Sequence, residues 1–284
     1  MKTIKTIITF ILAVTTLFFF DPAPLQAARD CHYTVSSLVA PLETRLSARM
    51  YYPCNIDELS EVGATTLTNG MGGTKEGMYW LAEPIAEAGM IVVTVSALDN
   101  MTVLGYETAH KSGIEILKAE NSNPTSPIYG KIGKYGIMGY SKGGGGSINA
   151  SSDLGNEVDT CIGLAPWGAT PTRNLSAATM ILTGTVDMIA PAYMGKTAFE
   201  ILPSDIPQLY ASLRGKAHLF WNMNVNPGNA DDLIIAWLKY HLEGDASYKS
   251  IIQNPGYEFT DYEYYEGSGS NGGPDGCNSS GLGF

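Results

Sequence analysis

The stretch KYGIMGYSKGGGGS, residues 134–147, joins a strand-like segment to the start of a glycine-rich helix. At its centre, Gly139-Tyr140-Ser141-Lys142-Gly143 matches the G-x-S-x-G pattern of a nucleophile elbow. In such an elbow the serine occupies a strained turn, and the two glycines let the strand and helix backbones approach closely. Chance matches are expected in a chain with 32 glycines, but the strand before the motif and the helix after it favour the elbow. Ser141 is therefore the predicted nucleophile.

Strand-like and helix-like segments alternate on both sides of this motif, with short connections between them. This alternation predicts an α/β chain with a mostly parallel central sheet and helices on both faces. No insertion that could form a lid domain separates the predicted strands. We expect strands at 64–69, 90–96, 134–139, 157–164, 177–183 and 208–213, and helices at 78–88, 108–120, 192–202 and 230–242.

A serine nucleophile needs a base, and the chain has four histidines. His218 follows the predicted strand 208–213 directly, which is where this class of fold places its catalytic histidine. The other three have different interpretations. His32 precedes the sheet, His110 lies early in a polar helix, and His241 lies near a helix end, where the terminal carbonyls stabilise a cation. His218 is the predicted base.

The acid should lie between the serine and the histidine, at the end of a strand. Asp187 lies in such a loop, and its carboxylate would hold His218 in the correct tautomer and stabilise the imidazolium. The order Ser141, Asp187, His218 is that of α/β-hydrolases. Asp205 opens a strand and Asp153 lies on the helix after the elbow, so both fit less well. The alternative interpretation of Asp187 is an ordinary loop-capping residue.

Two backbone N–H groups are expected to bind the oxyanion of an acyl-transfer reaction. One is that of Lys142, directly after the nucleophile. The other is that of Met71, in the glycine-rich loop after the predicted strand 64–69. Trp167 also follows a strand and could stack on an acyl or aromatic part of a substrate. An aromatic side chain at the rim of the core is an equally good interpretation of Trp167.

The N-terminal residues 1–27 have the pattern of a secretory signal peptide. Lys2 and Lys5 precede an apolar run over 7–20, and small residues follow at Ala27 and Ala28. The run is shorter than the roughly 20 residues of a membrane-spanning helix, although an uncleaved anchor is the alternative. The chain has 17 Lys and Arg against 28 Asp and Glu, a net charge of −11. This balance argues against binding to nucleic acid or to an anionic membrane.

Export makes disulfide formation available to the four cysteines. Cys31 and Cys54 flank two strand-like segments, 33–38 and 44–52, and a hairpin would bring the two cysteines together. A Cys31–Cys54 disulfide is the preferred pairing among the three full connectivities. Cys161 has the context of a buried strand, and Cys277 is either free or paired. No C-x-x-C spacing or His/Cys cluster indicates a metal site.

The composition changes near the C-terminus. No Lys or Arg follows Lys249, and Gly and Ser predominate from Gly267 onward. We therefore predict three parts: a signal peptide at 1–27, a catalytic domain at 28–252 and a flexible, acidic, Gly/Ser-rich tail at 253–284. Weak calcium binding by the tail is an alternative to simple solvation.

Several motifs together resemble those of bacterial cutinases and poly(ethylene terephthalate) hydrolases, in the dienelactone hydrolase-like part of the α/β-hydrolase superfamily. The most specific is the run of four glycines after Ser141 and Lys142, combined with Ala-Pro-Trp at 165–167. SPIYGK at 126–131, DMIAP at 187–191 and Ala-His at 217–218 agree as well. The resemblance extends from about Tyr33 to about Ile252. It implies a secreted carboxylester hydrolase without a cofactor, in which Trp167 and Met71 line an open groove.

Three positions differ from the pattern that this resemblance implies. The oxyanion-loop residue is usually aromatic in these enzymes and is Met71 here, and the residue after the nucleophile is usually Met or Gln and is Lys142 here. We expect Lys142 to pair with Glu76 or to point into solvent. Their disulfide beside the catalytic histidine has no counterpart, because Leu219 follows His218. Ester hydrolysis needs only the triad and two N–H donors, so it is still expected.

The sequence therefore predicts a secreted, monomeric serine esterase that acts through an acyl-enzyme, without metal or cofactor. Its expected partner is an ester substrate, with no nucleic acid and no membrane after signal cleavage. Polyesters such as cutin or synthetic analogues are the leading substrates. The alternatives are an esterase for small soluble or acetylated esters and a non-catalytic binding module that has kept the hydrolase fold.

Overall fold

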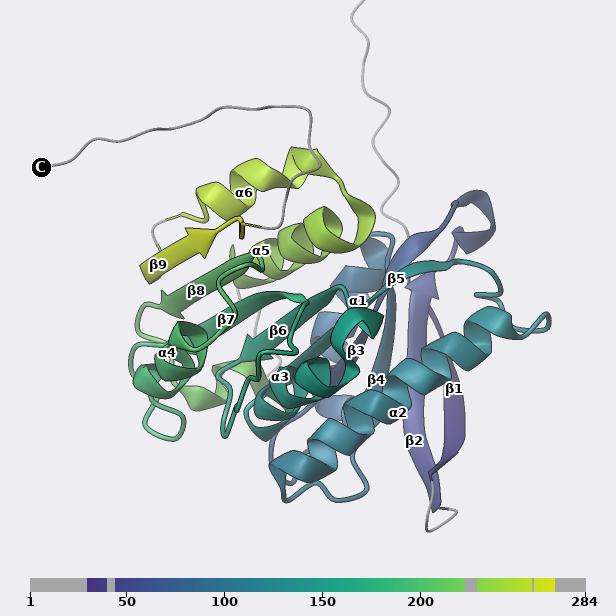
Figure 1. Cartoon of the computed structure of the whole chain (residues 1–284). Coiled ribbons are helices and arrows are strands. Elements are labelled where there is room, and N and C mark those ends of the chain that lie inside the picture. Colours follow the sequence, from purple (N-terminus) through teal and green to yellow (C-terminus); the bar gives the residue numbers. More distant parts are fainter. Residues whose placement is uncertain (1–29, 40–43, 223–228, 257, 269–284) are drawn as a thin grey trace, which may run out of the picture.

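The computed structural model describes residues 30–39, 44–222, 229–256 and 258–268 (Figure 1). Within these residues, one sheet has the strand order β1-β2-β4-β3-β5-β6-β7-β8-β9. The six central strands are parallel, and the strands at both edges run antiparallel to their neighbours. The strands are β1 Asp30–Val39, β2 Thr44–Pro53, β3 Val62–Thr68, β4 Ile91–Ser96, β5 Ile132–Tyr140, β6 Thr160–Leu164, β7 Ala178–Gly184, β8 Gln208–Leu213 and β9 Phe259–Tyr265.

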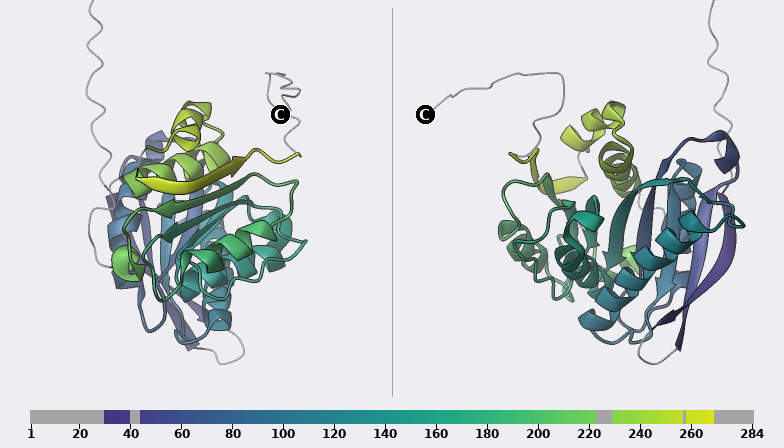
Figure 2. Two further views of the ribbon diagram at one scale, coloured as in Figure 1. Left: turned by 90° about the vertical axis from the view of Figure 1, so that its left-hand side faces the viewer. Right: turned by 45° about the vertical axis from the view of Figure 1, so that its right-hand side comes forward.

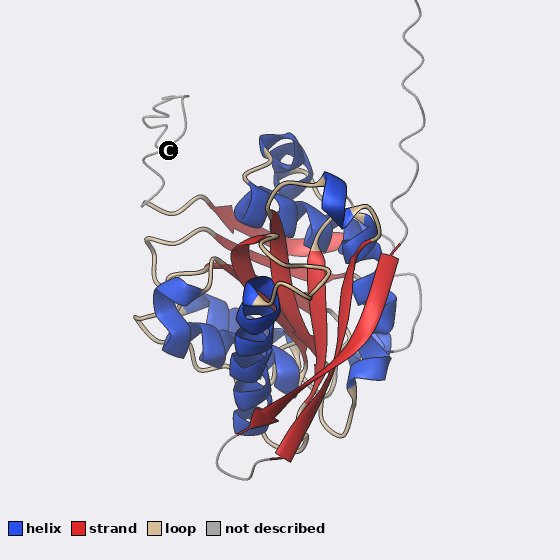
Figure 3. Ribbon diagram, turned by 90° about the vertical axis from the view of Figure 1, so that its right-hand side faces the viewer, coloured by secondary structure: helices blue, strands red, loops and turns tan. Residues whose placement is uncertain are grey.

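Helices cover both faces of this sheet (Figure 3). The helices α1, α5 and α6 pack in one apolar cluster and α2, α3 and α4 in the other. The predicted fold, a mostly parallel sheet between two helical layers, is confirmed. The helices are α1 Tyr79–Glu87, α2 Val103–Ser122, α3 Lys142–Leu154, α4 Ala192–Glu200, α5 Asn229–Leu238 and α6 Lys249–Gln253, and a π-helical turn at Lys239–Glu243 follows α5.

The central strands are buried along nearly their whole length because helices lie on both sides of them. Successive side chains point to opposite faces of a strand. In β5, for example, Ile137 packs in the cluster with α2, and Met138 packs in the cluster with α1. Continuous apolar runs in the sequence therefore correspond to strands that supply both cores.

The predicted boundary at residue 252 is wrong, because the sheet continues beyond it. Strand β9 pairs with β8 (Figure 2), Phe259 is buried and Tyr262 and Tyr264 pack against the core. The acidic side chains that made this stretch look like a tail are partly neutralised by the domain. Glu263 forms an ion pair with Lys196, and Glu266 forms one with Lys249 at 2.6 Å. The rest of the predicted tail, 269–284, lies outside the described residues.

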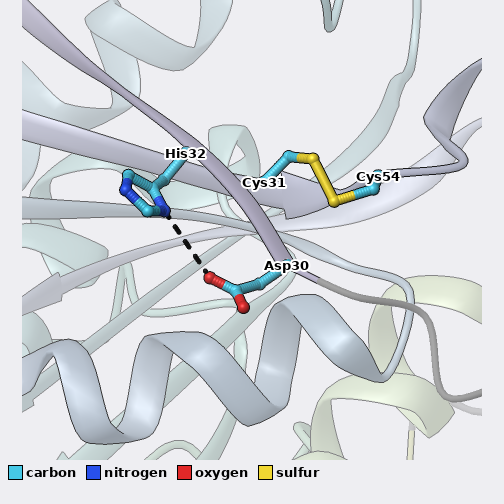
Figure 4. The surroundings of a disulfide bond; sticks show 4 residues. All are labelled: Asp30, Cys31, His32 and Cys54. Atoms are coloured by element: carbon cyan, nitrogen blue, oxygen red, sulfur yellow. Dashed lines mark ion pairs between the residues drawn. A yellow bond between two sulfur atoms is a disulfide. The ribbon is translucent and has the colours of Figure 1, made fainter.

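The predicted Cys31–Cys54 disulfide is confirmed, with the two Cα atoms 5.0 Å apart (Figure 4). It joins the start of β1 to the residue after β2, so it closes the open end of the hairpin. Asp30 and His32 form an ion pair beside it at 3.7 Å. Cys161 is a buried free thiol, as its strand context predicts, and Cys277 lies outside the described residues.

The predicted signal peptide at 1–27 also lies outside the described residues. In the part of the chain that the structure describes, no helix combines the length and the apolar character needed to cross a bilayer. The same residues contain no group of three or more His, Cys, Asp or Glu side chains that could hold a metal ion.

Candidate active site

The residues predicted for catalysis, the oxyanion hole and substrate binding all lie at one edge of the sheet. Strands β3, β5, β6, β7 and β8 are parallel neighbours, so their carboxyl ends meet at the same edge. The loops that follow them carry, in this order, Met71, Ser141, Trp167, Asp187 and His218.

Ser141 occupies a strained turn between β5 and α3, with φ 56° and ψ −120°. This region is unfavourable for a residue with a side chain. The flanking glycines are required by close backbone contacts. A Cβ on Gly139 would lie 2.3 Å from the carbonyl oxygen of Gly143, and one on Gly143 would lie 2.2 Å from that of Asn69. The G-x-S-x-G motif therefore forms the predicted elbow.

The structure brings Ser141, His218 and Asp187 into one hydrogen-bonded chain. The Nε2 atom of His218 lies 2.9 Å from the Oγ atom of Ser141, and its Nδ1 atom lies 2.7 Å from the Oδ2 atom of Asp187. All three residues are buried. Because an ionised carboxylate only accepts hydrogen bonds, Nδ1 of the imidazole carries the proton and Nε2 is free to accept one from the serine.

Asp187 combines the two roles that the sequence left open. Its Oδ2 atom faces His218, whereas its Oδ1 atom accepts hydrogen bonds from the backbone N–H groups of Ile189 and Ala190, at 2.8 and 2.7 Å. The second oxygen therefore caps its own loop. Both carboxylate oxygens are occupied, which fixes the orientation of the side chain toward the histidine.

The loop after β3 lies directly against the elbow. A Cβ on Gly70 would be 2.8 Å from the Cβ of Ser141, so glycine is needed at this position. The side chain of Asn69 holds the loop, since its Oδ1 accepts from the Gly70 N–H at 2.7 Å and its Nδ2 donates to the carbonyl of Thr74 at 3.1 Å. Among the described residues the Met71 N–H has no acceptor. The Lys142 N–H is in the first turn of α3, where N–H groups lack intrahelical partners.

The side chain of Lys142 does not pair with Glu76. Its Nζ donates to the carbonyl of Met101 at 2.6 Å, whereas Glu76 pairs with the adjacent Lys75 at 2.6 Å. The side chain of Lys142 therefore points toward the loop before α2.

Trp167 contributes to the site with its backbone as well as its ring. Its N–H donates to the carbonyl of Ser141 at 2.9 Å, and its side chain is 38% exposed. The ring is therefore available at the edge of the site. Met71 is 57% exposed on the neighbouring loop.

The interpretations of the other three histidines are wrong. His32 does not precede the sheet, because it lies in β1 and pairs with Tyr51 of β2. His110 is fully buried, and burial lowers its pKa to about 4. Its position on the apolar face of α2, with Tyr106, Ala109 and Gly113 at helical spacing, could have indicated this. His241 is not a cation at a helix end, because burial lowers its pKa to about 4 and its ring packs 4.1 Å from that of Trp237.

A sequence model of the PET hydrolase-like family matches residues 21–269. The chain belongs to the PET hydrolase-like family. Cutinase 1 of Thermobifida cellulosilytica is 27% identical to it over 242 residues, which cover 81% of this chain and 89% of the relative. A bis(hydroxyethyl) terephthalate hydrolase of Streptomyces coelicolor is 26% identical over 208 residues, covering 72% and 64%. The resemblance to cutinases and PET hydrolases is confirmed, and with it the class of this PET hydrolase-like protein, the carboxylic ester hydrolases.

Proposed function

We propose that this protein is a secreted serine esterase that hydrolyses polyesters through an acyl-enzyme. The observation that supports this best is the chain of hydrogen bonds from Asp187 through His218 to Ser141, with the serine on a strained turn at the carboxyl edge of the sheet. An aligned acid, base and nucleophile is the arrangement that serine hydrolases use.

In the first half of the reaction, Ser141 Oγ attacks the ester carbonyl carbon and gives its proton to Nε2 of His218. The imidazolium that forms is stabilised by the Asp187 carboxylate. The tetrahedral oxyanion accepts hydrogen bonds from the N–H groups of Met71 and Lys142, each worth about 3 kcal/mol of transition-state stabilisation. The intermediate then expels the alcohol, which takes the proton from Nε2.

In the second half, water attacks the acyl-Ser141 ester and gives a proton to Nε2. The same two N–H groups bind the second oxyanion. Collapse of this intermediate releases the carboxylic acid and returns the proton to Oγ of Ser141. In the net reaction, one ester and one water are converted to one carboxylic acid and one alcohol.

Exposed apolar side chains around the proposed triad support a polymeric substrate. Val186, Met188 and Ile189 flank Asp187 and are 51%, 88% and 53% exposed, and Leu219, next to His218, is 52% exposed. With Met71 and Trp167 they form an apolar rim around a buried nucleophile. Such a rim suits the repeated apolar and ester groups of a polyester better than a small soluble ester.

The proposal that the protein is secreted rests on the signal-peptide pattern of residues 1–27 and on the disulfide. Cys31 lies only a few residues after the expected cleavage site, and its bond with Cys54 requires an oxidising compartment to persist. Mass spectrometry of protein from the culture medium should give a mature N-terminus close to Ala28. An intact N-terminus retained with the cells would contradict secretion.

The nucleophile is tested with p-nitrophenyl butyrate and a fluorophosphonate probe. The wild-type protein should hydrolyse the ester and become labelled, and Ser141→Ala should lose both properties. Ser147→Ala on the same helix is the matched control and should retain both. A wild-type protein that is neither active nor labelled would favour a binding module, and full activity of Ser141→Ala would contradict the proposed nucleophile.

The substrate class is tested by comparing soluble products released from a polyester film with the rate on short-chain esters. We expect release from the film to fall strongly in Met188→Ser, which removes the most exposed apolar side chain of the rim, with little change on p-nitrophenyl butyrate. Hydrolysis confined to short esters would contradict a polyester substrate and favour an esterase for small molecules.

A further inference from the structure

Helix α2 presents two buried polar side chains toward the loops of the proposed oxyanion hole. Tyr106 and His110 are four residues apart, on the same face of the helix, and both are 0% exposed. Neither belongs to the proposed triad. Both form hydrogen bonds with backbone atoms that adjoin the two oxyanion donors.

The hydroxyl of Tyr106 donates to the carbonyl oxygen of Gly70 and lies 3.2 Å from that of Asn100. The Gly70 carbonyl belongs to the same peptide unit as the Met71 N–H. In a trans peptide the C=O and N–H bonds point in opposite directions. A hydroxyl that holds the carbonyl on the α2 side therefore turns the Met71 N–H away from α2.

The other donor peptide is held in the same way. The carbonyl of Ser141 shares a peptide unit with the Lys142 N–H, and it accepts hydrogen bonds from the N–H groups of Gly145 and Trp167, both at 2.9 Å. For the elbow, backbone donors fix the peptide. For the loop after β3, Gly73 supplies one backbone donor to Gly70, at 2.9 Å, and the side chain of Tyr106 supplies the other.

His110 connects the two segments that carry these donors. Its Nε2 atom lies 3.1 Å from the carbonyl oxygen of Gly143 and 3.0 Å from Oγ1 of Thr68, and its Nδ1 atom lies 2.7 Å from Oγ1 of Thr66. Because a carbonyl can only accept, Nε2 carries the proton and Nδ1 accepts from Thr66. One neutral imidazole thus bridges the end of β3 and the first turn of α3.

We infer that Tyr106 and His110 are positioning residues that set the orientation and spacing of the two oxyanion-hole N–H groups, those of Met71 and Lys142. The inference deepens the proposed function and rests on it. The donors come from segments separated along the chain by the whole of α2 and β5, so their relative position depends on contacts between those segments. The hydrogen bonds of α2 supply such contacts at both donors.

Tyr106→Phe is the main test, because it removes one hydroxyl and keeps the ring. We expect kcat on p-nitrophenyl butyrate to fall about 10-fold, a fraction of the roughly 10²- to 10³-fold loss when an oxyanion donor is removed altogether. KM should change less than twofold, because ground-state binding does not use the oxyanion hole. The Ki of an alkylboronic acid, whose tetrahedral adduct places an oxygen in the hole, should rise by the same factor as kcat falls. Tyr262→Phe, which also removes a hydroxyl bonded to a backbone carbonyl, is the matched control and should leave all three unchanged.

The role of His110 is tested by two amides that each keep one of its nitrogen positions. His110→Gln places its amide near Nε2 and keeps a donor for Gly143, whereas His110→Asn reaches only the Nδ1 position. We expect His110→Gln to retain kcat within threefold and His110→Asn to lose about 10-fold at unchanged KM, with the boronate Ki rising in parallel.

These measurements distinguish a positioning role of Tyr106 and His110 from a role in stability alone. Variants of Tyr106 and His110 that lower the melting temperature but keep wild-type kcat and boronate Ki at 25 °C would overturn the inference. An equal loss of kcat in His110→Gln and His110→Asn would also overturn it. If a variant of one residue does not fold, those of the other decide. A wild-type protein that neither hydrolyses the ester nor reacts with a fluorophosphonate would instead overturn the proposed function, before any variant is compared.

Discussion

The two ends of the central sheet are both rich in polar groups but differ in how these groups are used. At the amino end, an open groove of about 870 Å³ is lined by charged side chains, among them Lys134, Lys239, Glu61 and Glu243. At the carboxyl end, the proposed triad is nearly enclosed. Three of these charged side chains in the groove bind one another or the backbone. Lys239 pairs with Glu243 at 2.6 Å, Glu243 also accepts from the Gly63 N–H, and Lys134 donates to the carbonyl of His241.

The carboxyl end instead holds its polar groups in a sequence that can pass a proton. The serine lies on a strained turn, the imidazole has one nitrogen free to accept, and the carboxylate is fixed through both oxygens. The groove therefore lies at an end of the molecule where charges are paired with one another or with the backbone. What distinguishes the carboxyl end is the alignment of donor and acceptor atoms along the proposed triad.

The largest expected difference between the two ends is in catalysis. In Asp187→Asn the amide oxygen must take the Oδ1 position, because that atom accepts from two backbone N–H groups. The amide NH₂ then faces His218 and favours the tautomer with the proton on Nε2, which cannot accept the serine proton. We expect kcat to fall roughly 10⁴-fold, as this change does in other serine triads, measured with p-nitrophenyl butyrate.

Glu243→Gln makes the same acid-to-amide change at the amino end and is the matched control. It keeps an oxygen for Gly63 and loses only the ion pair with Lys239. Its kcat should stay within twofold of wild type. A loss of kcat in Glu243→Gln comparable with that in Asp187→Asn would contradict the proposal that catalysis depends on the carboxyl end alone.

The next effect is on stability and belongs to the amino end. The Cys31–Cys54 disulfide joins residues 23 positions apart and closes the hairpin of β1 and β2. Replacing both cysteines with serine should lower the free energy of unfolding by about 3 kcal/mol, because the unfolded chain gains the entropy of an open loop. Urea unfolding measures this loss, and kcat at 25 °C should stay unchanged. A variant that remains as stable as wild type would show that the bond adds nothing to the fold, and a reduced kcat would link the hairpin to the site.

Much of the carboxyl end could be predicted from the sequence, because its chemistry is tied to local signals. Ser141, Asp187 and His218 each follow a recognisable strand, and parallel strands bring their ends together without any knowledge of packing. The elbow glycines are also a local signal. The predicted positions for these side chains therefore agree with the observed hydrogen bonds.

The features that the sequence did not reveal depend on partners far along the chain. Strand β9 looked like an acidic tail because the lysine that pairs with Glu263 lies 67 residues earlier, at Lys196. The helical spacing could have indicated that His110 is buried, but not its hydrogen-bond partners Thr66 and Gly143, which lie 44 residues before it and 33 after it. Composition and local periodicity contain no information on such pairs.

The smallest expected effect compares the two buried histidines, one near each end. Burial lowers the pKa of both His110 and His241 to about 4, and Lys134 lowers that of His241 further while Glu266 opposes it. An unfolded histidine has a pKa near 6.5. Between these values the unfolded chain binds protons that the folded chain does not, so stability is full above about pH 6.5 and falls as the pH is lowered toward 4. Each histidine should contribute a slope of about 1.4 kcal/mol per pH unit.

Urea unfolding at pH 7, 6 and 5 tests this on His241→Phe and His110→Gln. Each variant should reduce the slope by about 1.4 kcal/mol per pH unit. At pH 7 the two variants should differ in their free energy of unfolding. His110→Gln loses the hydrogen bond to Thr66, whereas Nε2 of His241 has no partner among the described residues. His241→Phe keeps an aromatic ring against Trp237 and should lower the free energy of unfolding only slightly. An unchanged slope in His241→Phe would mean that this histidine is protonated in the folded state. If both variants lost the same free energy of unfolding at pH 7, buried polar groups would be equally well satisfied at both ends. The contrast between the two ends would then rest on catalysis alone.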